Sequence, residues 1–201
     1  MRKTCLLLLM LWLVQPWMAG AMVLDRILAV VNGEIIALSD VESELIFFEG
    51  LGISDSAIQE KVQKLIDQKL FLTEAKRFDV GNPSESEIQE ELQRMQKRFA
   101  SPDLFEKALR QSGMTLEDLK QKITEHLIVD RFIDQRIRFF VIVLPEEISH
   151  YYDDHHSDFQ NKPLADVENE IEKLLTTQKA KEKLEDYLSK VRAKANIQIN
   201  F

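Results

Sequence analysis

The chain has 201 residues, of which 45% are hydrophobic and 30% are charged, and its net charge is −8. This length suits one domain, because domains usually contain about 100–200 residues. Nucleic-acid binding requires clustered Lys and Arg on a positively charged surface, so the acidic balance argues against nucleic acid as a partner. The single cysteine, Cys5, leaves the chain without an internal disulfide.

The first residues have the composition of a cleavable export signal. Arg2 and Lys3 supply positive charge, residues 5–14 form an apolar run, and small residues at 19–21 provide a cleavage site. We therefore predict a signal peptide over residues 1–21. Its removal takes away the two basic residues and lowers the net charge from −8 to −10.

The predicted mature domain covers residues 22–201 and is expected in the periplasm. The apolar run of the signal is shorter than the about 20 residues that span a bilayer, which disfavours the alternative of an uncleaved membrane anchor. No later segment is apolar for long enough to cross a membrane, so no stable membrane insertion is expected.

A β-hairpin is predicted at the start of the mature chain. Residues 24–31 are rich in β-branched side chains and lead into Asn32 and Gly33, the strongest short signal for a hairpin turn. The second strand is expected over residues 34–38. Residues 195–201 alternate apolar and polar side chains as a strand does, and a lone strand would leave its backbone unpaired. Both chain ends are therefore expected to meet in one small sheet.

Helix-capping residues and apolar positions every three or four residues predict the helices that follow. Ser39 with Glu42 and Ser84 with Glu87 have the spacing of capping boxes. Helices are predicted from Ser39 toward Gly50, from Ser54 or Asp55 to Gly81, from Ser84 through Phe99, from Ser101 to Gly113, and from Thr115 toward Arg138.

The last third of the chain starts with an apolar segment over residues 139–143, whose β-branched and aromatic content favours an extended conformation. Pro145 suits the start of a short helix. A polar loop over 157–163 and a long final helix from Leu164 follow. The fold class is thus mainly α, with a small β-sheet formed by the N-terminal hairpin and the C-terminal strand.

Several stretches, in order, resemble SurA-type periplasmic chaperones. The matching segments, spread over nearly the whole mature chain, are residues 24–34 with 39–41, residues 113–119, residues 143–148 with Tyr151, Tyr152 and Phe159, and residues 164–201.

The resemblance implies a helical chaperone core of the SurA N-terminal domain family. Many members carry parvulin prolyl isomerase domains of about a hundred residues between the helix around Tyr151 and the closing helix. Here only residues 157–163 separate them, and the Gly-Gly turn of parvulins is absent from the sequence. We therefore expect that the protein binds clients without catalysing a reaction and that it uses no cofactor.

The expected function is ATP-independent binding of unfolded or extended segments of envelope and outer-membrane proteins. The alternative is a dedicated envelope assembly subunit, with its apolar helix faces buried in one partner or in a homodimer. An isomerase with an unrecognised site is the weakest reading, since no nucleophile stands at a recognisable spacing from a base.

Apolar residues near predicted helix ends and loops are the candidate client-binding set. Phe47 and Phe48 are adjacent, so one side of a helix cannot bury both. Exposed apolar area marks interaction sites, and methionine tolerates varied partners. The predicted crevice residues are Phe47, Phe48, Leu51, Met95, Phe99, Phe105 and Met114. Burial in an ordinary core is the alternative for each.

His150 and Asp154 are four residues apart and would share a helix face, as two metal ligands must. The sequence specifies no third ligand. We therefore interpret the pair as part of a solvated helix end and predict no metal site.

Overall fold

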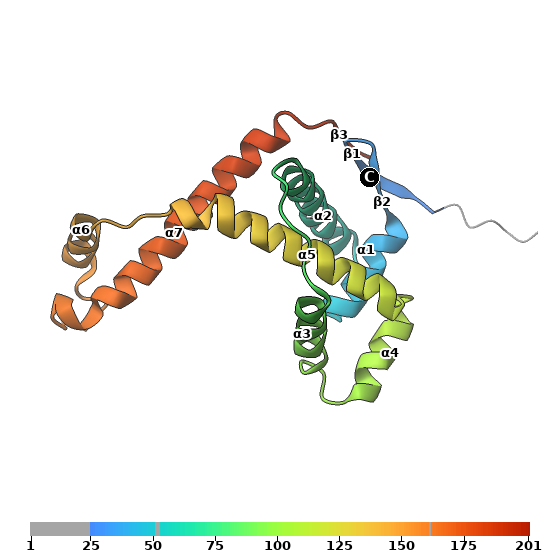
Figure 1. Cartoon of the computed structure of the whole chain (residues 1–201), viewed down its shortest axis with the longest axis horizontal. Helices are drawn as coiled ribbons and strands as arrows, with labels where there is room; N and C mark the ends of the chain where they lie inside the picture. The colour runs from blue at the N-terminus through green and yellow to red at the C-terminus, as the bar shows by residue number, and fades with distance from the viewer. Residues whose placement is uncertain (1–24, 51–52, 161) are drawn as a thin grey trace, which may run out of the picture.

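The computed structural model describes residues 25–50, 53–160 and 162–201. The predicted signal peptide, the predicted mature N-terminus at Met22, and Leu51 lie outside these ranges. Figure 1 shows a body that holds the sheet and helices α1 to α5, and an arm in which α7 extends away from the body to α6 at its tip.

The sheet joins the two ends of the described chain. It contains β1 (Ile27–Val31), β2 (Glu34–Ala37) and β3 (Ile197–Ile199) in the order β2-β1-β3, with both pairs antiparallel. Asn32 and Gly33 have φ angles of 51° and 91°, the left-handed values that a tight hairpin turn requires. The predicted hairpin and its pairing with the C-terminal strand are confirmed.

The first helix, α1 (Leu38–Glu44), continues into a π-helical turn, η1 (Leu45–Glu49). The predicted cap was wrong, because Ser39 lies inside the helix. Its amide donates to a carboxylate oxygen of Asp25 at 3.2 Å, and its hydroxyl donates to the other. Asp25, which precedes β1, thus ties the sheet to the helix.

Four longer helices complete the body: α2 (Asp55–Arg77), α3 (Glu85–Gln96), α4 (Pro102–Ser112) and α5 (Leu116–Arg136). Their starts follow the predicted caps. The Ser84 amide donates to Glu87 at 2.7 Å, and the Glu87 amide donates to the Ser84 hydroxyl at 3.3 Å. Local capping chemistry therefore sets where these helices begin.

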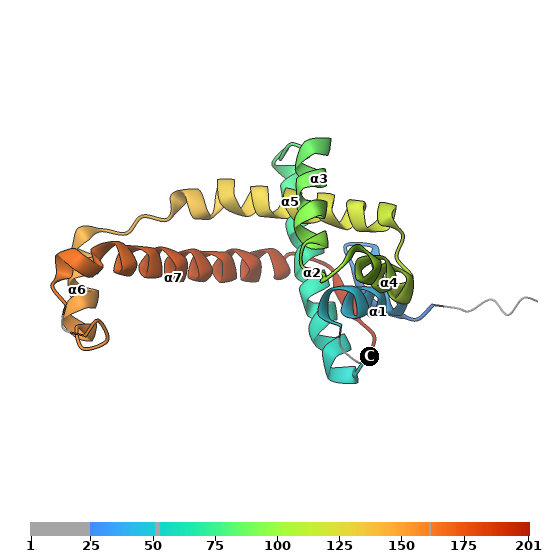
Figure 2. The same cartoon turned by 90° about the horizontal axis from the view of Figure 1, so that it is seen from below.

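The arm consists of a short 3-10 turn, η2 (Arg138–Phe140), and helices α6 (Pro145–His155) and α7 (Leu164–Arg192). Figure 2 shows α7 running beside the second half of α5 and back to the body. The predicted extended segment over 139–143 is only partly extended, because η2 occupies its first residues. The chain becomes extended at Val141, with φ and ψ of −85° and 120°.

Polar contacts attach α7 to α2. The Arg192 guanidinium donates to Asp67 at 2.7 Å and to the Gln63 side chain, and the Tyr187 hydroxyl donates to the buried Glu74. Burial and the neighbouring Glu74 carboxylate raise the pKa of Tyr187 to about 12, so its hydroxyl remains a donor at neutral pH. The arm therefore has a fixed attachment to the body.

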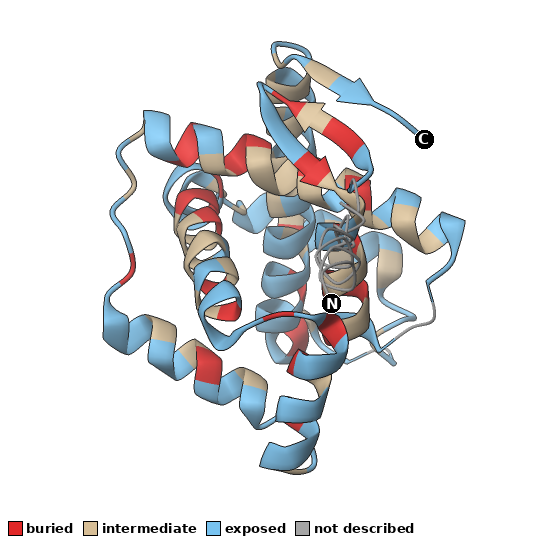
Figure 3. Ribbon diagram, turned by 90° about the vertical axis from the view of Figure 1, so that its right-hand side faces the viewer, coloured by how far each residue is buried: buried red, intermediate tan, exposed pale blue. Residues whose placement is uncertain are grey.

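Buried residues lie on one side of most elements, as Figure 3 shows by colour, whereas η2 and β3 contain none. They form clusters between the sheet, α1 and α2, between η1, α3, α4 and α5, between α2, α5 and α7, and between α6 and α7. Across the described ranges, no helix combines the length and the apolar composition needed to cross a membrane.

Candidate functional site: an apolar surface between η1, α3 and α4

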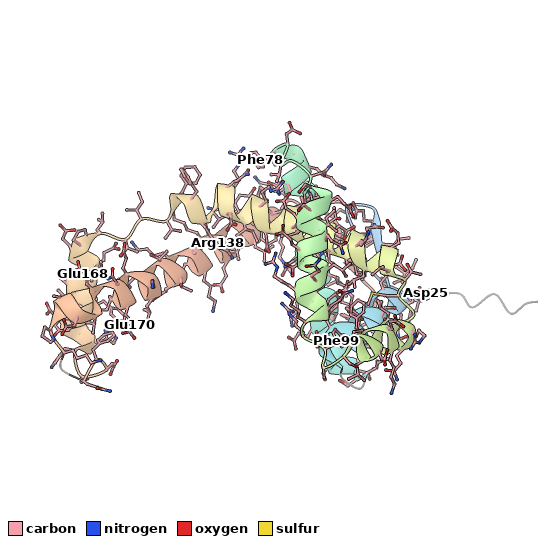
Figure 4. The ribbon with its side chains drawn as sticks, turned by 60° about the horizontal axis from the view of Figure 1, so that its bottom comes forward. Asp25, Phe78, Phe99, Arg138, Glu168 and Glu170 are labelled. Atoms are coloured by element: carbon pink, nitrogen blue, oxygen red, sulfur yellow. The ribbon has the colours of Figure 1, made fainter. Side chains whose placement is uncertain are left out.

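Four aromatic rings from η1, α4 and the connection between α3 and α4 meet at one end of the body. The ring of Phe47 lies 4.9 Å from that of Phe48 and 5.9 Å from those of Phe99 and Phe105, between centroids. Phe99 and Phe105 pack edge to face at 5.4 Å. Edge-to-face packing gives such a cluster a defined geometry. Figure 4 labels Phe99 beyond the end of α3, where the chain turns toward α4.

The adjacent phenylalanines have opposite roles in this cluster. Phe47 is 5% exposed and Phe48 is 41% exposed. Both residues lie in the π-helical turn η1, which directly follows α1. Gly50 ends this turn with a left-handed φ of 59°. Phe47 thus anchors the aromatic cluster from below while Phe48 remains on the surface.

An apolar hollow opens beside the cluster, between α3, α4 and the start of α5. Its volume is about 680 Å³. Phe99, Pro102, Phe105, Leu109 and Leu116 supply its apolar lining. Leu116, at the start of α5, is 45% exposed. The hollow therefore offers exposed apolar area to another molecule.

A smaller cavity of about 260 Å³ lies on the other side of the cluster, and Phe48 and Met95 both line it. Its floor is charged: buried Glu44 on α1 contacts Lys61 of α2 at 2.9 Å and Lys122 of α5 at 2.7 Å. The Lys61 ammonium also stands 5.7 Å from the centroid of the Phe48 ring. This ion triad joins three helices beneath the candidate surface.

Burial by itself would raise the pKa of Glu44, but the ammonium groups of Lys122 and Lys61 outweigh it and hold that pKa below the ordinary 4.5. The charged form is thus stabilised in the folded protein. Its contribution to stability is fully present above pH 4.5 and is lost as the pH falls through the lowered pKa.

Changing Glu44 to Gln is expected to lower the free energy of unfolding at pH 7 by about 2 kcal/mol. This is less than the 3–5 kcal/mol typical when a fully buried pair is broken, because Lys122 remains partly in water. Chemical denaturation at a series of pH values measures the difference, which should shrink toward zero in acid.

The control for Glu44 is Glu60→Gln, which breaks an exposed pair with Lys64 and should have little effect at any pH. A difference between wild type and Glu44→Gln that stays constant from neutral to acidic pH would contradict the role assigned to the triad.

The structure brings the predicted site residues into one region, though not onto one open surface. Phe47, Phe105 and Met114 are buried, so in this conformation they support the surface from beneath. Met95 and Phe99 are half-buried, and Phe48 is exposed. Sequence reasoning missed Pro102, Leu109 and Leu116 in the hollow, because Pro102 was interpreted only as a helix start and Leu116 only as part of the apolar repeat of the helix after Thr115.

His150 and Asp154 share a face of α6, with their side chains 3.3 Å apart. In the ranges that the structure describes, no group of three or more His, Cys, Asp or Glu side chains is arranged to hold a metal ion.

A helical body, a sheet that joins the chain ends and an arm of two helices define the class of this protein, which has the fold of SurA-like chaperones. A solved Campylobacter jejuni protein matches with a TM-score of 0.56 and 12% identity, over 87% of this chain and 99% of that one. It comes from work on two structurally related SurA-like chaperones, the virulence factor PEB4 and the periplasmic protein Cj1289.

Sequence similarity leads to the same group. The chain is 26% identical over 149 residues to the chaperone SurA of Alkalilimnicola ehrlichii, covering 70% of this chain and 34% of that protein. It is 27% identical over 108 residues to the foldase protein PrsA of Clostridium acetobutylicum, covering 52% of this chain and 32% of that protein. No family model matches. The predicted resemblance to SurA-type chaperones is confirmed, and the chain spans about a third of the length of these curated relatives.

Proposed function

We propose that this protein is an ATP-independent periplasmic chaperone that binds unfolded or extended segments of envelope and outer-membrane proteins. The observation that carries the proposal is the apolar hollow between α3 and α4, set on a SurA-like scaffold. The names of the relatives, a chaperone and a foldase, support the same reading.

The composition of the surface suits varied clients. Aromatic rings and the half-buried Met95 provide contacts that do not depend on one partner sequence, since methionine adapts its shape. Charged residues cover much of the remaining body, and a net charge far from zero keeps a complex with an unfolded client soluble.

Binding without isomerase catalysis is part of the proposal. Helix α6 ends at His155 and α7 begins at Leu164, so residues 156–163 connect them directly. A domain of about a hundred residues does not fit in this connection.

The matched substitutions Leu116→Gln and Leu104→Gln test the hollow. The two leucines are almost equally exposed, at 45% and 46%, but only Leu116 lines the hollow. Changing Leu116 is expected to weaken suppression of aggregation severalfold, while changing Leu104 leaves it unchanged. Each exposed substitution should alter stability by about 0.5 kcal/mol or less.

Light scattering measures the effect on two unrelated denatured proteins, an outer-membrane β-barrel and a soluble enzyme, at near-stoichiometric amounts of the protein. Protection of neither by the wild type, with recovery of one partner from envelope extract, would instead establish a dedicated assembly subunit. Equal loss in both variants would remove the hollow from the site.

A further inference from the structure

The segment from Phe139 in η2 to Leu144, just before α6, exposes apolar side chains more than any other part of the described chain. Phe139 is 79% exposed and Ile142 is 69% exposed, and Phe140 and Leu144 are also more than half exposed. Figures 1 and 2 show the segment as the link from the end of α5 to α6, alongside α7. Exposed apolar side chains in a row indicate an interaction surface.

The side chains of this segment alternate as in a half-buried strand. Phe140, Ile142 and Leu144 face water, whereas Val141 and Val143 are half-buried. Val143 packs against the cluster between α6 and α7. Backbone angles at Val141 and Leu144 are extended. From Val141 to Leu144 the segment is therefore extended as a strand is, with one face on the arm.

One edge of this extended segment is occupied by its own chain. The Lys183 ammonium donates to the Phe140 carbonyl at 2.6 Å, and the Lys179 ammonium donates to the Ile142 carbonyl at 2.9 Å. The Leu144 amide donates to the Glu147 carboxylate at 2.8 Å. Backbone groups of every second residue are thus fixed toward α7 and the start of α6.

The opposite edge is open from the Val141 carbonyl onward. In an extended strand, the N–H and C=O of one residue point to the same side, and successive residues alternate. On that side the Val141 amide donates back to the Arg138 carbonyl at 2.9 Å, whereas the Val141 carbonyl and the Val143 amide and carbonyl have no hydrogen-bond partner among the residues that the structure describes. An open strand edge is a template for another extended chain.

We propose that residues 140–144 form a docking edge on which an extended apolar segment of a client polypeptide adds as a β-strand. The inference rests on the proposed chaperone function and adds a second site to it, on the arm. Main-chain hydrogen bonds do not depend on the client's sequence, while Phe140, Ile142 and Leu144 contact its apolar side chains. Unfolded chains, whose backbone groups are free, meet both requirements.

The charge around the edge disfavours a lipid surface as the occupant. Lys179 and Lys183 are engaged with the strand, and α6 next to it carries Glu146, Asp153 and Asp154. Anionic headgroups attract basic segments and are repelled by acidic ones. An extended polypeptide needs no such charge.

Amide hydrogen exchange at Val143 tests the proposal directly. The probe is a short peptide in which valine alternates with threonine between terminal lysines, added to the intact protein. Exchange of the Val143 amide is expected to slow at least tenfold when the peptide binds. A peptide carrying N-methyl groups on alternate amides should bind about tenfold more weakly, since tenfold corresponds to about one hydrogen bond.

Ile142→Gln should weaken peptide binding severalfold, whereas Leu104→Gln in the body should not. Bound peptide with unchanged Val143 exchange, or equal affinity for the N-methylated peptide, would overturn the proposal. If the Val143 amide exchanges slowly without peptide, and still more slowly at higher protein concentration, a second copy of the protein occupies the edge. That result would also overturn the proposal. Aggregation suppression is measured in parallel. If suppression persists while the peptide does not bind at this edge, the docking proposal fails and the proposed chaperone function does not.

Discussion

Changing Phe47 to Ala is expected to lower the free energy of unfolding by about 3–5 kcal/mol, because a large aromatic side chain leaves a packed interior. Phe47 is buried and contacts three other rings, from η1, from the connection after α3 and from α4. Its loss should leave a cavity where α4 packs against η1. Urea denaturation followed by circular dichroism measures the change.

The adjacent Phe48 is the matched control for Phe47. Phe48→Ser should lower the free energy of unfolding by only about 1 kcal/mol, because the ring is partly exposed and makes one edge-to-face contact with Phe47. The same substitution should weaken aggregation suppression. A loss for Phe48 as large as that for Phe47 would place Phe48 in the core and remove it from the client surface.

Removing residues 196–201 is expected to lower the free energy of unfolding by about 3–5 kcal/mol, from about 1 kcal/mol for each lost hydrogen bond and from the burial of Ile197. β1 is the central strand, and β3 pairs with the edge of β1 that β2 does not occupy. The Asn32 amide donates to the Asn196 carbonyl, and the Asn200 amide donates to the Leu28 carbonyl, both at 2.8 Å.

Removal of Phe201 alone is the control for the strand, since this residue is more than half exposed and lies beyond β3. Its loss should change stability by about 0.5 kcal/mol or less. Thermal melting compares the three proteins. An unchanged melting temperature after removal of the whole strand would mean that β3 does not stabilise the sheet.

Signals that act within a few residues predicted the fold well. Asn32 and Gly33 specified the hairpin because the turn needs left-handed backbone angles at both positions. Ser84 with Glu87, and Pro102, marked helix starts because a cap depends on amides in the first turn alone. Pairing of the two chain ends followed from backbone hydrogen bonding, which a terminal strand cannot satisfy by itself.

The candidate site was predicted less completely, because exposure depends on what packs over a residue. The sequence placed Phe105 and Met114 with the surface residues, yet both are buried where α4 folds back over η1. It also favoured an extended conformation over residues 139–143, which the structure adopts only from Val141.

The sequence by itself therefore determined most helix starts, with the exception of α1, and also the hairpin and the resemblance to SurA-type chaperones, since these depend on neighbouring residues and their order. Only the tertiary structure decided which of Phe47 and Phe48 faces water and that Leu116 lines the apolar hollow. It also decided that the edge at Val143 stays open. The physical reason is that burial and backbone pairing are set by helices and strands far apart in the chain.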